Sequence, residues 1–235
     1  MTDGGRTSRR TLFIILFAAA AAVLFAAMLY CGAVSIPASE VTAVITGQDT
    51  SKEAWRTIVL ESRLPMALTA AVAGAALSVA GLMLQTVFRN SLAGPSILGI
   101  STGASLGVAI VLLCAASLPA IHEAAGTFGV IGGALAGAVA VLAILSLFSS
   151  MLRSPLSLLI VGIMVSYLTS SVISLLNFFA PAESVRSFVV WGLGSYSGTD
   201  LRASLILALA VVLPLAATVF YAKPLNAMLL GDRYL

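Results

Sequence analysis

The sequence predicts an all-α fold, a polytopic membrane bundle of about six transmembrane helices in a single domain over residues 1–235. Two observations carry this prediction. Only 9% of the residues are charged and 60% are hydrophobic, whereas a soluble domain has roughly 25% charged residues. The apolar residues also gather into runs of about 20, the length that a helix needs to cross the hydrocarbon core of a bilayer. Lipid is therefore the expected surrounding of most of the chain.

The first span is expected at residues 11–33, directly after the arginines Arg6, Arg9 and Arg10. Basic residues before an apolar run also begin a secretory signal peptide, and small residues near Ala33 resemble a cleavage site. The apolar run is nevertheless longer than the ~7–15 residues usual in a signal peptide, and five further spans follow it. These features favour an uncleaved first helix.

The second span is expected at residues 64–84. Segment 34–60 before it is too long for a turn, and Pro37 with Glu40 close behind it predicts a short helix at the membrane interface. Arg63 and Pro65 stand where the second span begins. An arginine there can anchor the helix to lipid headgroups, with proline in the first helical turn; this interpretation stays open beside a functional one.

The third and fourth spans, residues 97–118 and 126–149, carry a glycine at every fourth position. This spacing places the glycines on one helix face, where another backbone can pack closely. Simple packing and sliding of the helices during a transport cycle are both compatible with it. The helix-packing residues predicted are Gly99, Gly103, Gly107, Gly129, Gly133 and Gly137.

The fifth and sixth spans are expected at residues 156–179 and 201–222. Segment 180–200 between them is apolar but too short and too rich in glycine to cross a membrane. We expect a short helix at the outer face, with Trp191 and Tyr196 as interface anchors. After the sixth span, residues 232–235 look like the start of an amphipathic cytosolic helix.

The charges of the connecting segments predict the orientation. With the N-terminus inside, the cytosolic segments hold seven of the twelve Lys and Arg residues, three of them clustered before the first span. The positive-inside rule therefore favours a cytosolic N-terminus.

The residue types exclude several classes of function. Motifs of metalloproteases, serine hydrolases and phosphate-binding loops are missing from the sequence, and His122 is its single histidine. We therefore expect no enzyme activity, cofactor or metal site. Basic residues are scattered without aromatic neighbours, which argues against nucleic-acid binding. The spans hold no Asp, Glu, Lys or Arg near their middle, which argues against proton coupling, so energy for transport would come from another subunit.

Five pieces of the chain resemble, in order and spacing, the membrane permeases of ABC importers for iron–siderophores, haem and cobalamin. They are Ser62-Arg-Leu-Pro65, the small-residue run 73–81, residues 85–107, Trp191-Gly192 and residues 223–232. The family usually has Asn-Pro-Leu-Ala where this chain has Asn90-Ser-Leu-Ala93. Its members have about ten spans, so the chain resembles the N-terminal part of a permease: a truncated gene, a split subunit or a fragment.

The resemblance implies a bacterial plasma-membrane permease that imports an iron chelate (siderophore or haem) or cobalamin. Its implied partners are a second permease subunit in a homodimer, two cytosolic ATPase subunits and an extracytoplasmic substrate-binding protein. We expect the chain alone to insert into the membrane without binding its ATPase stably or supporting uptake. A membrane scaffold or remnant that transports nothing, and a self-contained channel, remain alternatives.

The resemblance also implies roles for individual residues. An arginine at the position of Arg63 receives an acidic residue of the binding protein. The family's second arginine, three residues later, is replaced by Met66, for which Arg56 offers a substitute. The implied cytosolic gate and ATPase-coupling residues are Ser154 and Pro155, and Leu230, Gly231 and Asp232.

Overall fold

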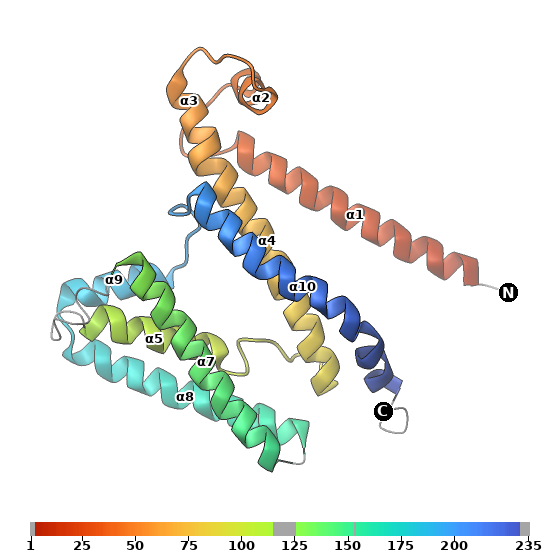
Figure 1. The fold of residues 1–235 in the computed structure, drawn as a ribbon, viewed down its shortest axis with the longest axis vertical. Coiled ribbons are helices and arrows are strands. Elements are labelled where there is room, and N and C mark those ends of the chain that lie inside the picture. Colours follow the sequence, from red (N-terminus) through yellow and green to blue (C-terminus); the bar gives the residue numbers. More distant parts are fainter. Residues whose placement is uncertain (1–2, 115–125, 153, 231–235) are drawn as a thin grey trace. The chain divides into compact units, whose positions relative to one another are not determined.

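The computed structural model describes residues 3–114, 126–152 and 154–230, and the elements in these ranges are all helices. Figure 1 shows them in chain order, coloured from red at the N-terminus to blue at the C-terminus. The all-α class predicted from composition is confirmed. The chain divides into two compact units, residues 1–76 with 196–216 and residues 77–195 with 217–235.

The first unit begins with α1 (Asp3–Tyr30), which starts with polar residues and is apolar after Arg10. Two short helices follow, α2 (Ala38–Thr46) and α3 (Glu53–Thr57), and then a π-helical turn, η1 (Ile58–Arg63), which continues into α4 (Leu64–Phe88). The beginning of α10 (Leu201–Leu230) completes the unit. The short helix expected after Pro37 is present as α2, which ends at Gly47 in the left-handed conformation that glycine favours; its place at the membrane interface stays a prediction.

The second unit is built around three helices that pack on one another: α5 (Ile100–Cys114), α7 (Thr127–Met151) and α8 (Pro155–Phe179). The short helix expected in segment 180–200 is present as α9 (Ala182–Gly192), which packs against α5 (Figure 1). The buried cluster of the unit joins the end of α4 and the loop before α5 to α7, through Phe88, Ala93, Leu98, Val141 and Leu145.

Five helices in the described part of the chain are long and apolar enough to cross a membrane. Their spanning stretches are Arg9–Tyr30, Glu53–Val87, Phe128–Met151, Leu156–Phe179 and Leu201–Met228. The third predicted span, residues 97–118, differs, because α5 begins at Ile100 and is described over only 15 residues, to Cys114. Residues 97–99 belong to the loop before it, and residues 115–118 lie outside the described residues. The sixth also differs, since α10 continues beyond residue 222 and through Pro224. Membrane helices tolerate proline when other groups satisfy the freed backbone carbonyl.

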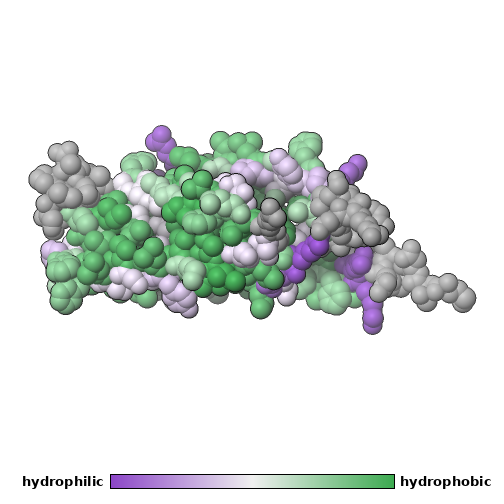
Figure 2. All heavy atoms as spheres, turned by 90° about the horizontal axis from the view of Figure 1, so that it is seen from below, coloured by the Kyte–Doolittle hydropathy of each residue, from purple (hydrophilic) through white to green (hydrophobic). Residues whose placement is uncertain are grey.

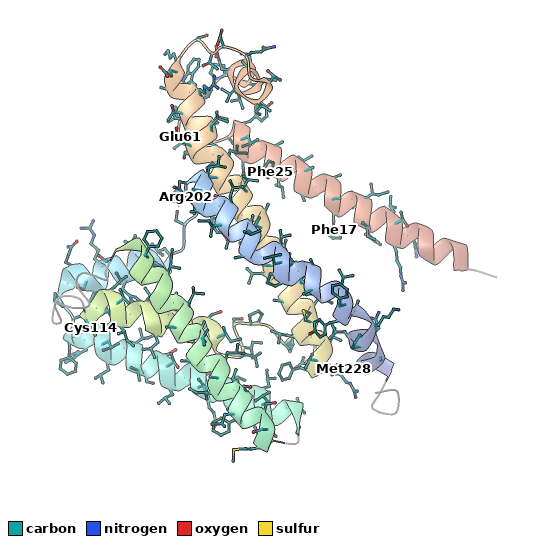
Figure 3. All side chains as sticks on the ribbon, in the orientation of Figure 1. Phe17, Phe25, Glu61, Cys114, Arg202 and Met228 are labelled. Atoms are coloured by element: carbon teal, nitrogen blue, oxygen red, sulfur yellow. The ribbon has the colours of Figure 1, made fainter. Side chains whose placement is uncertain are left out.

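Apolar side chains cover most of the surface of these helices. In Figure 2 green apolar residues dominate the face shown, and hydrophilic residues are confined to a few places. Along α1, Figure 3 marks Phe17 and Phe25; Phe17 is 72% exposed. Exposed apolar surface of this extent is expected where the surrounding solvent is lipid.

Candidate functional site

Segment 36–60 forms a small module with its own apolar core, which we call the α2–α3 module. Ile36, Val41, Val44 and Val59 are buried together, with Trp55 packed against them. A polar clamp closes the loop between the helices: the Glu40 carboxylate accepts from the Ser51 amide at 3.1 Å and from the Ser51 hydroxyl. The module is therefore a folded element that precedes the second span rather than a loose loop.

Charged side chains lie on the outside of this module. Lys52 stands over the ring of Trp55, with Nζ 5.0 Å from the ring centroid, an arrangement that stabilises the cation electrostatically. Asp49, Glu53 and Arg56 are exposed. Arg56, predicted as a docking residue, is thus in reach of a protein partner on this surface.

Arg63, the other predicted docking residue, has a different environment. Its side chain is 3% exposed and lies at the end of η1. Nη1 donates to the carbonyl oxygens of Leu29 at 2.8 Å and Tyr30 at 3.0 Å, and Nη2 donates to that of Val34. The sequence could not reveal these partners, because they lie 29 to 34 residues away along the chain. The docking role of Arg63 remains a prediction, and direct docking would require the guanidinium to leave these carbonyls.

The predicted glycine packing takes the form of a seam between α5 and α7. A Cβ added to Gly107 would lie 1.8 Å from the Gly133 carbonyl oxygen, and one added to Gly137 would lie 2.0 Å from that of Gly103. Gly103 and Gly133 are also closely approached, each with a neighbour under 3.0 Å from an added Cβ. The two backbones are therefore in direct contact, which side chains at these positions would prevent.

Gly99 departs from the pattern predicted for the third span. It precedes α5 instead of lying on its face, and its φ of +80° is the left-handed conformation. An added Cβ would lie 2.7 Å from Ser166 Oγ and 3.0 Å from the Gly162 carbonyl oxygen, both on α8. Gly99 thus ends the loop of residues 89–99 and lets it approach α8. Gly129 lies in the first turn of α7, where its amide bonds to Gly126 at 3.0 Å.

The loop before α5 is the polar turn that the sequence predicts at residues 89–93. Arg89 has a positive φ of 47°, and the Asn90 side-chain oxygen accepts from the Leu92 amide at 2.9 Å. This is the Asx turn that asparagine forms with the backbone two residues ahead. The serine that replaces the family's proline therefore leaves a well-formed turn.

An apolar groove of about 860 Å³ lies between α5, α7 and α8. Phe148, Met164, Leu168 and Val172 are among its walls, and Thr169 is the one residue with a polar side chain among those that line it. No titratable side chain contributes to this lining. The groove can therefore hold apolar groups but offers nothing to bind an ion.

A stripe of hydroxyl groups on α8 was not predicted. Tyr167, Ser171 and Ser174 recur at helical spacing and are exposed, Tyr167 by 73%. The two serine hydroxyls bond to carbonyls of their own helix, Tyr167 O at 2.9 Å and Ser170 O at 3.0 Å. Their oxygens keep acceptor capacity. The spacing of four and three residues is visible in the sequence and could have revealed this face.

The predicted gate and coupling residues lie at helix ends. Ser154 immediately precedes α8, and its carbonyl oxygen accepts from the Leu158 amide at 3.3 Å; Pro155 is the first residue of that helix. Leu230 is the last residue of α10. The predicted coupling residues Gly231 and Asp232 lie outside the described residues, as does His122. Among the residues described, no group of three or more His, Cys, Asp or Glu side chains is placed to hold a metal ion.

Residues 16–234 match the model of a known family, the FecCD transport family. The chain belongs to the FecCD transport family. This assignment agrees with the permease resemblance carried by the arginine–proline start of the second span and by the glycine-rich third span.

Several curated permease proteins are similar in sequence to this chain. The chain is 34% identical over 185 residues to the hemin transport system permease protein HmuU of Yersinia pestis, covering 78% of this chain and 54% of that protein. It is 35% identical to a probable iron chelatin transport system permease protein of Helicobacter pylori, covering 74% and 51%. It is 32% identical to the vitamin B12 import system permease protein BtuC of Escherichia coli, covering 80% and 56%. The chain thus spans about half the length of these curated relatives.

A solved structure shares the overall fold of the chain. An inward-facing metal-chelate type ABC transporter superposes with a TM-score of 0.76, covering 94% of this chain and 65% of the solved chain. Their sequences are 24% identical, so this likeness concerns the fold alone.

Proposed function

We propose that the chain is a transmembrane permease subunit of a binding-protein-dependent ABC importer for an iron chelate (siderophore or haem) or cobalamin. Membership of the FecCD family carries this proposal. The names of the relatives, which include hemin, iron chelatin and vitamin B12 permeases, supply the range of substrates.

The proposed energy source is a separate pair of cytosolic ATPase subunits. The described spans carry no Asp, Glu, Lys or Arg near their middle, and ion-coupled transporters place such charged groups there. In this proposal the bacterial plasma membrane holds the chain with its N-terminus in the cytosol. A second permease subunit pairs with it, and Leu230, Gly231 and Asp232 belong to the coupling surface.

The proposed docking surface for an extracytoplasmic substrate-binding protein is the α2–α3 module. Arg56 is exposed there, close in sequence to the exposed Lys52, Glu53 and Glu61; Figure 3 labels Glu61. Exposed charges guide association and orientation more than they add affinity. A partner with carboxylates facing Arg56 would suit this surface.

The proposed contact surface for the solute is the hydroxyl stripe of α8. Hydroxyl groups recurring along one face of a membrane helix can accept hydrogen bonds from a polar solute without the cost of burying a charge. In this proposal Ser154 and Pro155 form the cytosolic gate at the start of the same helix.

Reconstituted transport tests this proposal. The chain is placed in proteoliposomes with an ATPase subunit and a substrate-binding protein of the same importer class from the same genome. By itself the chain should insert without retaining the ATPase or supporting uptake, since it spans about half the length of its curated relatives. Copurification of the ATPase and ATP-dependent uptake of a siderophore, haem or cobalamin are expected when the remaining spans of a permease of this class are supplied as a second chain. A double variant, Ser171→Leu with Ser174→Leu, is expected to lower uptake while leaving ATPase copurification unchanged.

Two control measurements separate the alternatives. Arg56→Glu should weaken capture of the binding protein, most at low salt where charges are least screened. Arg186→Glu, which changes an exposed arginine on α9, serves as the matched control.

Ion currents through bilayers containing this chain alone would support a channel. Failure of both ATPase and binding protein to associate would support a scaffold without transport.

A further inference from the structure

The contacts of helix α1 with α2 and η1 of its unit lie at its last turn. All side chains of residues 9–24 are exposed, and Leu29 is the one buried residue among the described side chains of α1. The neighbours of α1 in this unit are α2 and η1, which both lie beside its carboxyl end. The position of the first span relative to the α2–α3 module therefore depends on contacts around Leu29 and Tyr30.

The last carbonyl groups of a helix lack partners inside the helix. At the end of α1 the Ala27 carbonyl accepts from the Cys31 amide at 2.8 Å. The carbonyls of Leu29 and Tyr30 accept instead from Nη1 of Arg63. A guanidinium suits this position doubly, because it supplies several donors in a fixed fork and places positive charge at the negative end of the helix dipole.

The same guanidinium also holds the link between α1 and α2. Its Nη2 group donates to the Val34 carbonyl, three residues beyond Cys31. The link packs so closely that a Cβ added to Gly32 would lie 2.9 Å from Nε and 3.0 Å from Cζ of Arg63. A glycine at position 32 thus leaves room for the arginine to reach all three carbonyls.

A second, weaker polar contact between α1 and α2 lies beside the hydrogen bonds of Arg63. The hydroxyls of Tyr30, the last residue of α1, and Thr42 on α2 are 3.3 Å apart. That pair is exposed, so water competes for it, whereas the Arg63 bond to Leu29 is buried. At this junction the Arg63 bond to Leu29 is buried and its bonds to Tyr30 and Val34 are partly buried, whereas the hydroxyl pair is exposed.

We propose that Arg63 is a positioning residue that fastens the carboxyl end of α1 to η1 and so sets the position of the α2–α3 module against the first span. Three hydrogen bonds to two chain segments, Leu29–Tyr30 and Val34, together with near-complete burial, carry this proposal. It does not depend on the proposed transport role. It gives Arg63 a different role from Arg56, whose exposed side chain remains available to a partner.

Pulsed electron paramagnetic resonance on the full chain in lipid nanodiscs tests the proposal. Spin labels are attached at Val23→Cys on α1 and Ile45→Cys on α2, both exposed sites, after Cys31 and Cys114 have been replaced by serine. We expect a narrow distance distribution with Arg63 present and a broad one in Arg63→Ala. Gly32→Ala should broaden it as well, because its methyl group displaces the guanidinium.

Amide hydrogen exchange measures how strongly Arg63 stabilises the end of α1. Amides of residues 27–31 should exchange roughly tenfold faster or more in Arg63→Ala, as expected for losing hydrogen bonds to a charged group. Arg63→Lys should restore part of the protection, because an ammonium supplies donors without the planar fork. Protection of α5 and α7 should stay unchanged, which shows that the variant is folded.

Arg56→Ala is the matched control, since it removes an exposed arginine of the same segment and should leave both measurements at the parent values. Unchanged distance distributions and exchange rates in Arg63→Ala would overturn the proposal and return Arg63 to the surface role predicted from the sequence.

Discussion

Replacing Gly107 or Gly137 by alanine should loosen the α5–α7 seam, and the structure gives the size of the effect. A methyl group at Gly107 would begin 1.8 Å from the Gly133 carbonyl oxygen. Ordinary contact begins near 3.4 Å, so the backbones would have to separate by about 1.6 Å, and a gap of 0.5–1 Å already forfeits a quarter to a half of a van der Waals contact. Overpacking typically costs about 1–3 kcal/mol. Because the obstacle here is backbone, we expect the upper part of this range.

Gly132→Ala supplies the matched control. Gly132 precedes Gly133 on α7, it is exposed, and an added Cβ would meet nothing within 4 Å. Alanine favours a helix over glycine by up to about 1 kcal/mol, so this variant should be neutral or slightly more stable. The sign of the change in unfolding free energy should therefore differ between neighbouring helix faces.

The assay is equilibrium unfolding of the full chain in mixed micelles at increasing mole fractions of sodium dodecyl sulfate, followed by circular dichroism. Combining Gly107→Ala with Gly137→Ala should cost less than the two single changes together, because the first separation already makes room for the second methyl group. Equal unfolding free energies for Gly107→Ala and Gly132→Ala would refute the seam.

Two further predictions concern other parts of the chain. Ser204→Ala should lower the unfolding free energy by about 1 kcal/mol, because it removes a buried hydrogen bond between the hydroxyls of Ser204 and Thr69, 2.8 Å apart, that joins α10 to α4. Ser187→Ala, which changes an exposed serine, is the control in the same unfolding assay. Equal stability of the two variants would contradict the role of the Ser204–Thr69 pair. A fluorescent protein fused after Leu235 should be bright and alkaline phosphatase fused there inactive, since the charge pattern predicts a cytosolic N-terminus and six predicted spans return the chain to the same side; an active phosphatase would reverse the predicted orientation or change the number of spans.

The features that the sequence predicted correctly depend on local pattern. The runs of apolar residues are long helices, and α2 and α9 form where proline precedes a short amphipathic segment with glutamate in the first turn. The polar turn after α4 follows from Asn90, whose side chain bonds two residues ahead. Each of these rests on residues within a few positions of one another.

The features that the sequence did not predict depend on contacts between residues far apart in the chain. The burial of Arg63 follows from carbonyls on another helix, and a local reading of an arginine before a span favours an exposed anchor. Gly99 shares the four-residue spacing of Gly103 and Gly107, but its positive φ places it before the helix and against α8. Spacing alone does not show where a helix begins, so it could not separate Gly99 from the other two.

The seam geometry also bears on the two interpretations of the glycine pattern, fixed packing and sliding. Gly103 lies against Gly137 and Gly107 against Gly133, so α5 and α7 meet in antiparallel register. A slide by one residue, about 1.5 Å, would bring a residue with a Cβ against a backbone that already lies in contact. A slide by four residues, about 6 Å, would bring Gly107 to Gly129 and Gly103 to Gly133, where glycines meet again. Intermediate positions are sterically blocked, so the seam permits either a fixed register or one discrete step. Because a full step would also pull Val141 and Leu145 out of the buried cluster that they form with Leu98, the fixed register is favoured, and α5 and α7 should move as one body in any transport cycle.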